Sequence, residues 1–228
     1  MNVLAISDIH GEKNENLNKY IKENGVDLVI ISGDLTDFGP LEFVGEFIGE
    51  IHDLGVDVLA IPGNCDPNGI CNAITDTDAV CLHNNIIDYN DLIIFGFGGS
   101  NPTPFNTPGE FQDPHLYDAL KELYAEYEYI ANDKIPKIKI VLTHAPPINT
   151  DADKIEGGAH VGSESLRKII EEFKPDINLC GHVHEGKSIG KINDTFVVNP
   201  GMLKDNYACL IKIDDDLNYD VSLVSLND

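Results

Sequence analysis

The sequence is poor in basic residues, and arginine is nearly absent. It has 15 lysines and arginines against 39 aspartates and glutamates, a formal net charge of −24, and its one arginine is Arg167. Proteins that bind nucleic acids or anionic membranes need a basic surface to contact phosphates, so neither partner is expected. An anionic ligand would have to be held mainly by bound metal ions, because the general electrostatic field repels anions.

Long apolar stretches and a regular cysteine pattern are also missing. No segment approaches the roughly 20 apolar residues that a membrane span needs, and the chain opens on the short run VLAI without a basic leader. The five cysteines are odd in number and irregularly spaced. We therefore expect a cytoplasmic protein with reduced thiols.

Several enzyme templates are absent as well. The sequence has no G-x-x-x-x-G-K-[ST] loop, no G-x-G-x-x-G at a strand–helix junction, no H-E-x-x-H and no G-x-S-x-G elbow. No run rich in serine, glycine or proline separates two patterned halves, so residues 1–228 are expected to form one domain.

Short apolar, β-branched runs alternate with helical patterns along the chain. The runs predict strands over residues 2–7, 26–32, 56–61, 138–143 and 176–180. Apolar residues at helical spacing predict helices over about 40–51, with Pro40 in the first turn, and over 166–173. A third helix is expected over about 113–132, opened by Asp113 and Pro114. From about 187 to 226, alternating segments predict a mostly antiparallel sheet.

Residues that can bind metals follow the ends of the five predicted strands. They are Asp8, His10, Asp34, Asn64, His144, His182 and His184. Sites in open α/β sheets form beyond the carboxyl ends of strands, and residues two apart in an extended chain face the same side. Four imidazoles, two carboxylates and one amide are too many for one tetrahedral zinc but suit two divalent ions that share a carboxylate. Mn, Fe, Zn and Ni all fit such ligands.

The order D-x-H, G-D, G-N-x-D, H and G-H-x-H resembles the calcineurin-like metallophosphoesterase superfamily, from Asp8 to His184. The segments LTHAPP and GAHVGS are similar to those of its smaller prokaryotic phosphoesterases. The resemblance implies an α/β fold, a four-layer αββα sandwich of two mixed β-sheets flanked by helices. It also implies that Asp8, His10 and His184 bind one metal, that Asn64, His144 and His182 bind the other, and that Asp34 bridges both.

This resemblance implies hydrolysis of a small phosphate ester, a phosphodiester or a phosphomonoester. Two divalent ions would deprotonate a bridging water, whose hydroxide attacks phosphorus directly without a phosphoenzyme. A nuclease and a catalytically silent interaction scaffold are the alternatives. The missing basic surface argues against the nuclease, and the seven filled ligand positions argue against the scaffold.

The sequence departs from the family pattern at Cys65, where many members have a histidine near the leaving group. A thiol with a pKa near 8.5 is a poorer proton donor, so acid catalysis from this position is in doubt, and simple packing is the alternative. Asp66, without a histidine partner, is expected to cap the following turn or to hold a supporting hydrogen bond. His160, in the glycine-rich segment GGAHVG, is a candidate to reach the phosphate or the leaving group, beside Asp34 and Asn64; the alternative is loop packing.

The longest loop-like stretch is GFGGSNPTPFNTPGEF, residues 96–111. Long loops in compact domains are often functional covers, so it is a candidate border of the site. Phe105 and Phe111 could stack on an aromatic group, although packing of the loop on its own domain is the favoured interpretation. His52, His83 and His115 lie outside any motif and are interpreted as structural or exposed.

Overall fold

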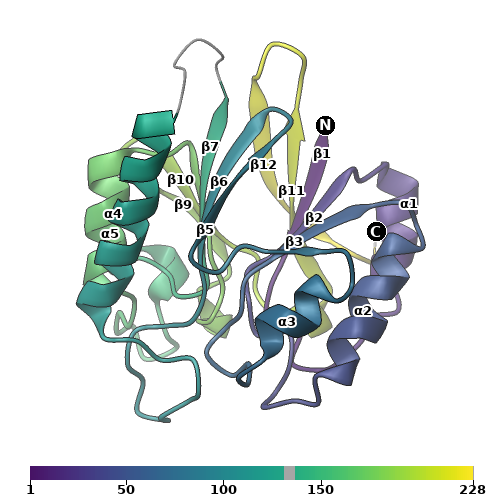
Figure 1. Ribbon diagram of the computed structural model, residues 1–228, viewed down its shortest axis with the longest axis horizontal. Coiled ribbons are helices and arrows are strands. Elements are labelled where there is room, and N and C mark those ends of the chain that lie inside the picture. The colour runs from purple at the N-terminus through teal and green to yellow at the C-terminus, as the bar shows by residue number, and fades with distance from the viewer. Residues whose placement is uncertain (131–136, 228) are drawn as a thin grey trace.

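The computed structural model describes residues 1–130 and 137–227, in which the strands form two six-stranded mixed sheets packed face to face (Figure 1). Helices cover the outer face of each sheet, so the layers are helix, sheet, sheet and helix. This arrangement confirms the αββα sandwich that the sequence resemblance implies.

The first sheet has the strand order β12-β11-β1-β2-β3-β4. Its parallel part contains β1 (Asn2–Ile6), β2 (Leu28–Ile31), β3 (Asp57–Ala60) and β4 (Val80–Cys81). The C-terminal strands β11 (Tyr207–Ile213) and β12 (Tyr219–Ser225) extend it as a hairpin, with β11 antiparallel to β1. Helices α1 (Leu17–Asn24), α2 (Glu42–His52) and α3 (Ile70–Thr75) lie on its outer side (Figure 1).

The second sheet has the strand order β5-β6-β7-β8-β10-β9. Its strands are β5 (Asn85–Tyr89), β6 (Leu92–Phe97), β7 (Ile138–Thr143), β8 (Ile177–Leu179), β9 (Ser188–Ile192) and β10 (Thr195–Asn199). Strands β6, β7, β8 and β10 run parallel, with β5 and β9 antiparallel at the edges. The paired helices α4 (Asp113–Ile130) and α5 (Glu164–Phe173) cover its outer face (Figure 1).

Alternation along the central strands explains why they are apolar at nearly every position. In β1, Val3 and Ala5 belong to the cluster between the two sheets, whereas Leu4 and Ile6 pack in the cluster under α1 and α2. A strand that is buried on both faces has no position left for a polar side chain. Polar residues of these segments are therefore displaced to the strand ends, where the candidate site lies.

The five predicted strands are confirmed to within two residues at each end, and the predicted helices correspond to α2, α4 and α5. Helix α2 begins at Glu42, so Pro40 precedes it rather than occupying its first turn. Asp113 begins α4, but its carboxylate accepts hydrogen bonds from the Ser163 hydroxyl and the Ser165 backbone N–H at the start of α5. The predicted C-terminal end of α4, near residue 132, lies outside the described residues.

The prediction of one mostly antiparallel C-terminal sheet is wrong. Strands β9 and β10 form a hairpin that extends the second sheet, in which β10 pairs parallel with β8. Strands β11 and β12 form a hairpin that extends the first sheet. The alternating patterns identify these strands correctly, but partner choice depends on contacts between distant parts of the sequence, such as Asn2 opposite Lys212.

Candidate metal centre

The seven candidate ligands lie at the carboxyl ends of strands from both sheets. Asp8, Asp34 and Asn64 follow β1, β2 and β3 of the first sheet, and His144 and His182 follow β7 and β8 of the second. His184 begins the short 3-10 helix His184–Gly186. Parallel strands place their carboxyl ends at one edge, and the two sheets present this edge on the same side of the sandwich (Figure 1).

The backbone turns sharply at these strand ends. Asp8, His10, Asp34 and His182 have φ angles of 53°, 50°, 51° and 67°, in the left-handed region that non-glycine residues seldom adopt. Such conformations persist where surrounding structure over-determines them, and they cluster at functional sites. These turns follow the strand ends, where the candidate ligands gather.

Asp8, His10 and His184 form the first group of side chains that could hold a metal ion. Their ligand atoms lie within 4.8 Å of one another. The Asp8 carboxylate is 3.3 Å from His184 Nε2 and 3.9 Å from His10 Nε2, and the two imidazole Nε2 atoms are 3.2 Å apart. The backbone N–H of His182 donates to both Asp8 oxygens, at 3.2 and 3.1 Å, which fixes the carboxylate.

Asn64, His144 and Asp34 converge on a second point. His144 Nε2 lies 2.9 Å from Asn64 Oδ1 and 3.3 Å from Asp34 Oδ2. Nδ1 of His144 is 2.7 Å from the Ser32 carbonyl and donates to it, which orients the ring with Nε2 toward the site. The His182 ring lies against that of His144, with centroids 5.1 Å apart.

Asp34 lies between the two groups. Its Oδ2 atom is 3.7 Å from His10 Nε2 and 3.3 Å from His144 Nε2, while Oδ1 accepts a hydrogen bond of 2.8 Å from the Cys65 backbone N–H. Burial alone would raise the pKa of Asp34, but the charge and hydrogen bond of His144 and the charge of His10 outweigh it, and the pKa falls well below its ordinary value. Asp34 is therefore a carboxylate that both groups can share.

The histidines respond differently to their surroundings. Burial, reinforced by the His144 charge, lowers the pKa of His182 to about 4, so His182 is neutral near pH 7. Burial also disfavours charge on His144, but Asp34 and Asp8 outweigh it and raise the pKa of His144 to about 9. A metal ion that binds through His144 must therefore displace a proton, as expected for a ligand set held ready for a cation.

Glycines allow the strand ends to approach closely. A Cβ atom on Gly63 would lie 2.0 Å from the Asp34 carboxylate, and one on Gly181 would lie 1.9 Å from the Ser7 hydroxyl. Gly33 has a φ of 102°, and a Cβ there would lie 2.6 Å from His144 Nδ1. Any larger residue at these three positions would displace a candidate ligand or its neighbour.

Asp66 supports the turns that carry Asp34 and Asn64. Its Oδ2 accepts hydrogen bonds from the backbone N–H groups of Gly63 (2.8 Å) and Leu35 (3.1 Å). Its Oδ1 accepts from the backbone N–H and the hydroxyl of Thr36, at 2.8 and 3.0 Å. Burial and the nearby Asp34 charge raise the pKa of Asp66 despite these donors. This geometry agrees with the supporting hydrogen bond expected from the sequence.

The sequence left open whether Cys65 contacts the site, and the parts played by Thr107 and Glu110 were not predicted from it. The Cys65 sulfur lies within 4.8 Å of the ligand atoms of His10 and Asp34, so the thiol faces the site rather than only packing. Asn64 Nδ2 donates to Thr107 Oγ1 at 2.9 Å, and that hydroxyl donates to Glu110 at 2.8 Å, which sets the Asn64 amide with its oxygen toward His144. The T-x-x-E spacing of Thr107 and Glu110, typical of a local side-chain–backbone turn, was the available signal.

His160 lies in the loop between η1 (Asp151–Asp153) and α5. Its Nδ1 is 2.6 Å from the buried carboxylate of Asp153, which also accepts the backbone N–H groups of Thr150 and Gly162. This pairing holds the ring by one nitrogen and leaves Nε2 free of hydrogen bonds to the described residues. A role for His160 at the phosphate or the leaving group stays a prediction.

Two of the remaining histidines, His83 and His115, pack against aromatic side chains. His83 accepts a hydrogen bond from Gly98 at 3.1 Å, and its ring lies against Phe97 and Phe111. His115 stacks on the same Phe111, so Phe111 packs within its own domain, as the favoured interpretation of the loop has it. The Phe105 side chain behaves differently, with 79% of its surface exposed.

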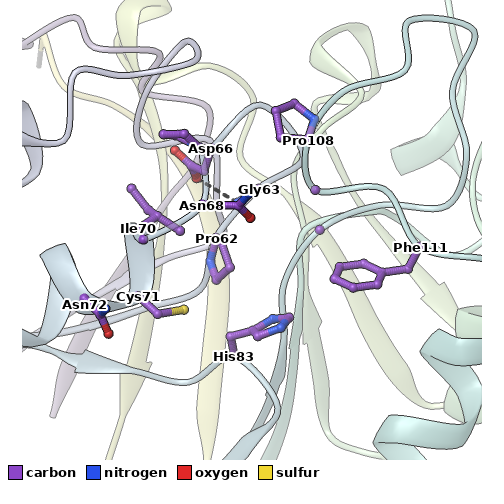
Figure 2. A pocket seen from close by; sticks show the side chains of 14 residues that line it. Pro62, Gly63, Asp66, Asn68, Ile70, Cys71, Asn72, His83, Pro108 and Phe111 are labelled. Carbon is purple, nitrogen blue, oxygen red and sulfur yellow. Dashed lines mark hydrogen bonds between the residues drawn. The ribbon is translucent and has the colours of Figure 1, made fainter.

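Two cavities flank the candidate metal centre. One of about 780 Å³ adjoins His182 and His184 and is bordered by residues 101–105 of the long loop. The other, of about 280 Å³, lies behind the turn that carries Asn64. Figure 2 shows the second cavity between Pro62, Cys71, His83 and Phe111, with Asp66 bonded to Gly63 at its edge.

The sequence from residue 1 to residue 186 matches the model of the family described as calcineurin-like phosphoesterase. The chain belongs to this family. The matched region includes all seven candidate ligands, from Asp8 to His184. Family membership confirms the resemblance inferred from the motif order.

Relatives of known sequence or structure cover nearly the whole chain. A curated relative, the uncharacterized protein MJ1162 of Methanocaldococcus jannaschii, is 34% identical over 204 residues, which cover 88% of each chain. The crystal structure of TT1561 of Thermus thermophilus superposes with a TM-score of 0.73 at 18% identity, covering 99% of this chain and 98% of that one. A putative 5′-nucleotidase from Staphylococcus aureus has a TM-score of 0.62 at 16% identity, and the match covers 99% of this chain and 54% of that chain. The structural likenesses show the fold.

The residues present fit the divalent metals that the family implies. Imidazole nitrogens, carboxylate oxygens and an amide oxygen are the ligand types preferred by Mn, Fe, Zn and Ni. Their ligand atoms approach one another closely at two points that share Asp34. Within the described part of the chain, no helix is both long and apolar enough to cross a membrane.

Proposed function

We propose that the chain is a dinuclear-metal-dependent phosphoesterase that hydrolyses small phosphodiesters, phosphomonoesters or both by direct attack of water. The observation that carries this proposal is the position of Asp34. One carboxylate oxygen lies 3.7 Å from His10 Nε2 and 3.3 Å from His144 Nε2, between two groups of candidate ligands. A shared carboxylate is the characteristic of a two-metal site, whereas one structural ion needs no such bridge.

The proposed ligand assignment follows the two groups. Asp8, His10 and His184 would hold one ion, and Asn64, His144 and His182 would hold the other, with Asp34 shared. The distances of Asp8 to His184 and of Asn64 to His144 support it. The chain as a whole, residues 1–228, would act as one domain, since both sheets contribute ligands.

The residues of the chain have distinct tasks in this proposal. When bound, two divalent cations supply a deprotonated water near neutral pH and neutralise charge on the phosphoryl group. Asp34 and Asn64 would help to hold the cations, and the Ser32 carbonyl fixes the ring of His144. Cys65 faces the site, but burial, with the charge of Asp34, raises the pKa of its thiol far above the ordinary value, so it does not protonate a leaving group. Esters with good leaving groups are the expected substrates.

His160 is proposed as a further catalytic residue that contacts the phosphate or the leaving group through Nε2. Its pairing with buried Asp153 supports an oriented ring. A His160→Ala variant that keeps full turnover on several esters would contradict this role. The assignment of the seven ligand positions does not depend on that outcome.

The proposed function is tested by turnover of bis-p-nitrophenyl phosphate and p-nitrophenyl phosphate. Metal-stripped protein would be assayed after addition of Mn, Zn, Ni, Co or Mg. We expect release of p-nitrophenol to require a metal and to be lost in Asp34→Asn. The control is Asp37→Asn, a change at an exposed neighbouring residue, which should keep the activity. Two bound metals without release under any condition would favour the interaction scaffold, and salt-dependent DNA binding would favour a nuclease.

The proposed substrates are small phosphate esters, and neither nucleic acids nor membranes are expected partners. The net charge of −24 supports this proposal because it repels polyanions. The cytoplasmic location stays a prediction. The ratio of diester to monoester turnover in the same assay would narrow the substrate class.

A further inference from the structure

The cavity of about 780 Å³ beside the metal centre is built from three segments. Residues 101–105 of the long loop form one side, residues 155–157 and Val161 form another, and residues 182–185 join it to the candidate ligands. The side-chain amide of Asn101 donates to the Val161 carbonyl at 3.3 Å, so the two loops contact each other. The cavity therefore opens directly at His182 and His184 and is large enough for a ring-bearing organic group.

Apolar side chains are exposed in this cavity to an unusual degree. Among the described residues, three large hydrophobic side chains are exposed: Phe38 (58%), Phe105 (79%) and Val161 (39%). Two of the three, Phe105 and Val161, line this one cavity. Single exposed hydrophobic residues need no explanation, but two at the same cavity beside a polar site indicate an apolar ligand surface.

The charges of the residues that line the cavity argue against an anionic group as its occupant. The acidic residues of the lining are Glu156 and Glu185, and none of the described residues that line it is lysine or arginine. A second phosphate or a carboxylate seated away from the proposed metal ions at His182 and His184 would meet these carboxylates without a lysine or arginine to compensate. The single phosphoryl group must therefore lie at the metal centre, and whatever enters the cavity carries no negative charge.

We infer that the substrate is a phosphate ester whose organic group is an apolar ring without negative charge, seated in this cavity against Phe105. This inference rests on the proposed function, which places the phosphoryl group beside His182 and His184. It excludes nucleoside polyphosphates and sugar bisphosphates as substrates. Phe105 is a specificity residue, because it contacts the ring and does not contact the phosphoryl group.

Phosphonates that cannot be hydrolysed test the inference by binding alone. Calorimetry with the manganese-loaded protein would compare methylphosphonate, phenylphosphonate and 4-carboxyphenylphosphonate. A ring packed against an aromatic side chain should bind about 5- to 10-fold more tightly than a methyl group. The added carboxylate of 4-carboxyphenylphosphonate should remove most of that gain.

The matched variants are Phe105→Ala and Phe38→Ala, which remove the same exposed ring inside and outside the cavity. Phe105→Ala should reduce the preference for phenylphosphonate to about 2-fold or less while methylphosphonate binds as before. Phe38→Ala should leave all three affinities unchanged. Both positions are largely exposed, so folding of the variants is not at risk.

The outcomes separate the inference from the proposed function. Equal affinity of methyl- and phenylphosphonate in a protein that hydrolyses p-nitrophenyl esters would overturn the inference and leave the function standing. A preference that persists in Phe105→Ala would also overturn it. Failure of every phosphonate to bind the metal-loaded protein, together with absent hydrolysis, would overturn both.

Discussion

Substitution of Asp66 tests how much the hydrogen bonds to its carboxylate stabilise the turns around the site. The two oxygens of Asp66 accept four hydrogen bonds, from the N–H groups of Gly63, Leu35 and Thr36 and from the Thr36 hydroxyl. Asp66→Asn keeps the shape but replaces one oxygen by an NH₂ group. Two buried donors then face a donor instead of an acceptor.

The cost follows from the number of donors that lose their partner. A buried donor left unsatisfied costs about 1–3 kcal/mol, so two cost roughly 2–6 kcal/mol. Loss of the buried charge offsets part of this, because burial already raises the pKa of Asp66. We expect Asp66→Asn to lower the free energy of unfolding by about 3 kcal/mol, which corresponds to a fall in Tm of roughly 6–12 °C.

Urea unfolding of the chelated protein measures this change without a contribution from bound metal. The control is Asp37→Asn, which removes the same formal charge from an exposed side chain in the adjacent loop. It should change stability by no more than about 0.5 kcal/mol. If Asp66→Asn costs less than about 1 kcal/mol, the hydrogen bonds to Asp66 do not hold the turns, and the reasoning is refuted.

Three further predictions concern the site. In Gly181→Ala, the added Cβ would lie 1.9 Å from the Ser7 hydroxyl. The substitution should lower the free energy of unfolding by about 1–3 kcal/mol and weaken metal binding. An unchanged metal affinity, measured by calorimetry, would contradict this prediction. In chelated protein, Asp34 outweighs burial and raises the pKa of His144 to about 9, so the pair stabilises the fold fully below about pH 6.5 and less as pH rises through 9. Between pH 6 and pH 9.5, the free energy of unfolding measured with urea should fall by more in the wild type than in His144→Gln. Cys65→His should raise phenyl phosphate turnover relative to p-nitrophenyl phosphate by at least about tenfold, and an unchanged ratio would count against it.

Much of the site was predictable because its signals are local. Asp8 and His10 follow a strand whose short apolar run is complete at Ile6, and the G-H-x-H spacing places His182 and His184 together. Each candidate ligand could be recognised as a candidate from the end of its own strand alone. Convergence then followed from the rule that parallel strands end at one edge.

The remaining features depend on contacts between distant segments. The hydrogen bond of Asn64 to Thr107 spans 43 residues, and nothing near Asn64 indicates it. Helix α1 was not predicted because its buried residues are Leu17, Tyr20 and Ile21, too short a stripe among polar neighbours. The distribution of β9–β12 between two sheets likewise depends on which edge strand is free, which periodicity does not encode.

The two sheets contribute candidate ligands to the same site, and this has a consequence for stability. Asp8, Asp34 and Asn64 belong to one sheet and His144 and His182 to the other, so ions bound between them would cross-link the two halves of the sandwich. Sliding of one sheet over the other would then require ligands to dissociate. Resistance to unfolding should rise with metal concentration by mass action, which makes metal supply a determinant of how long the protein survives as well as how fast it works.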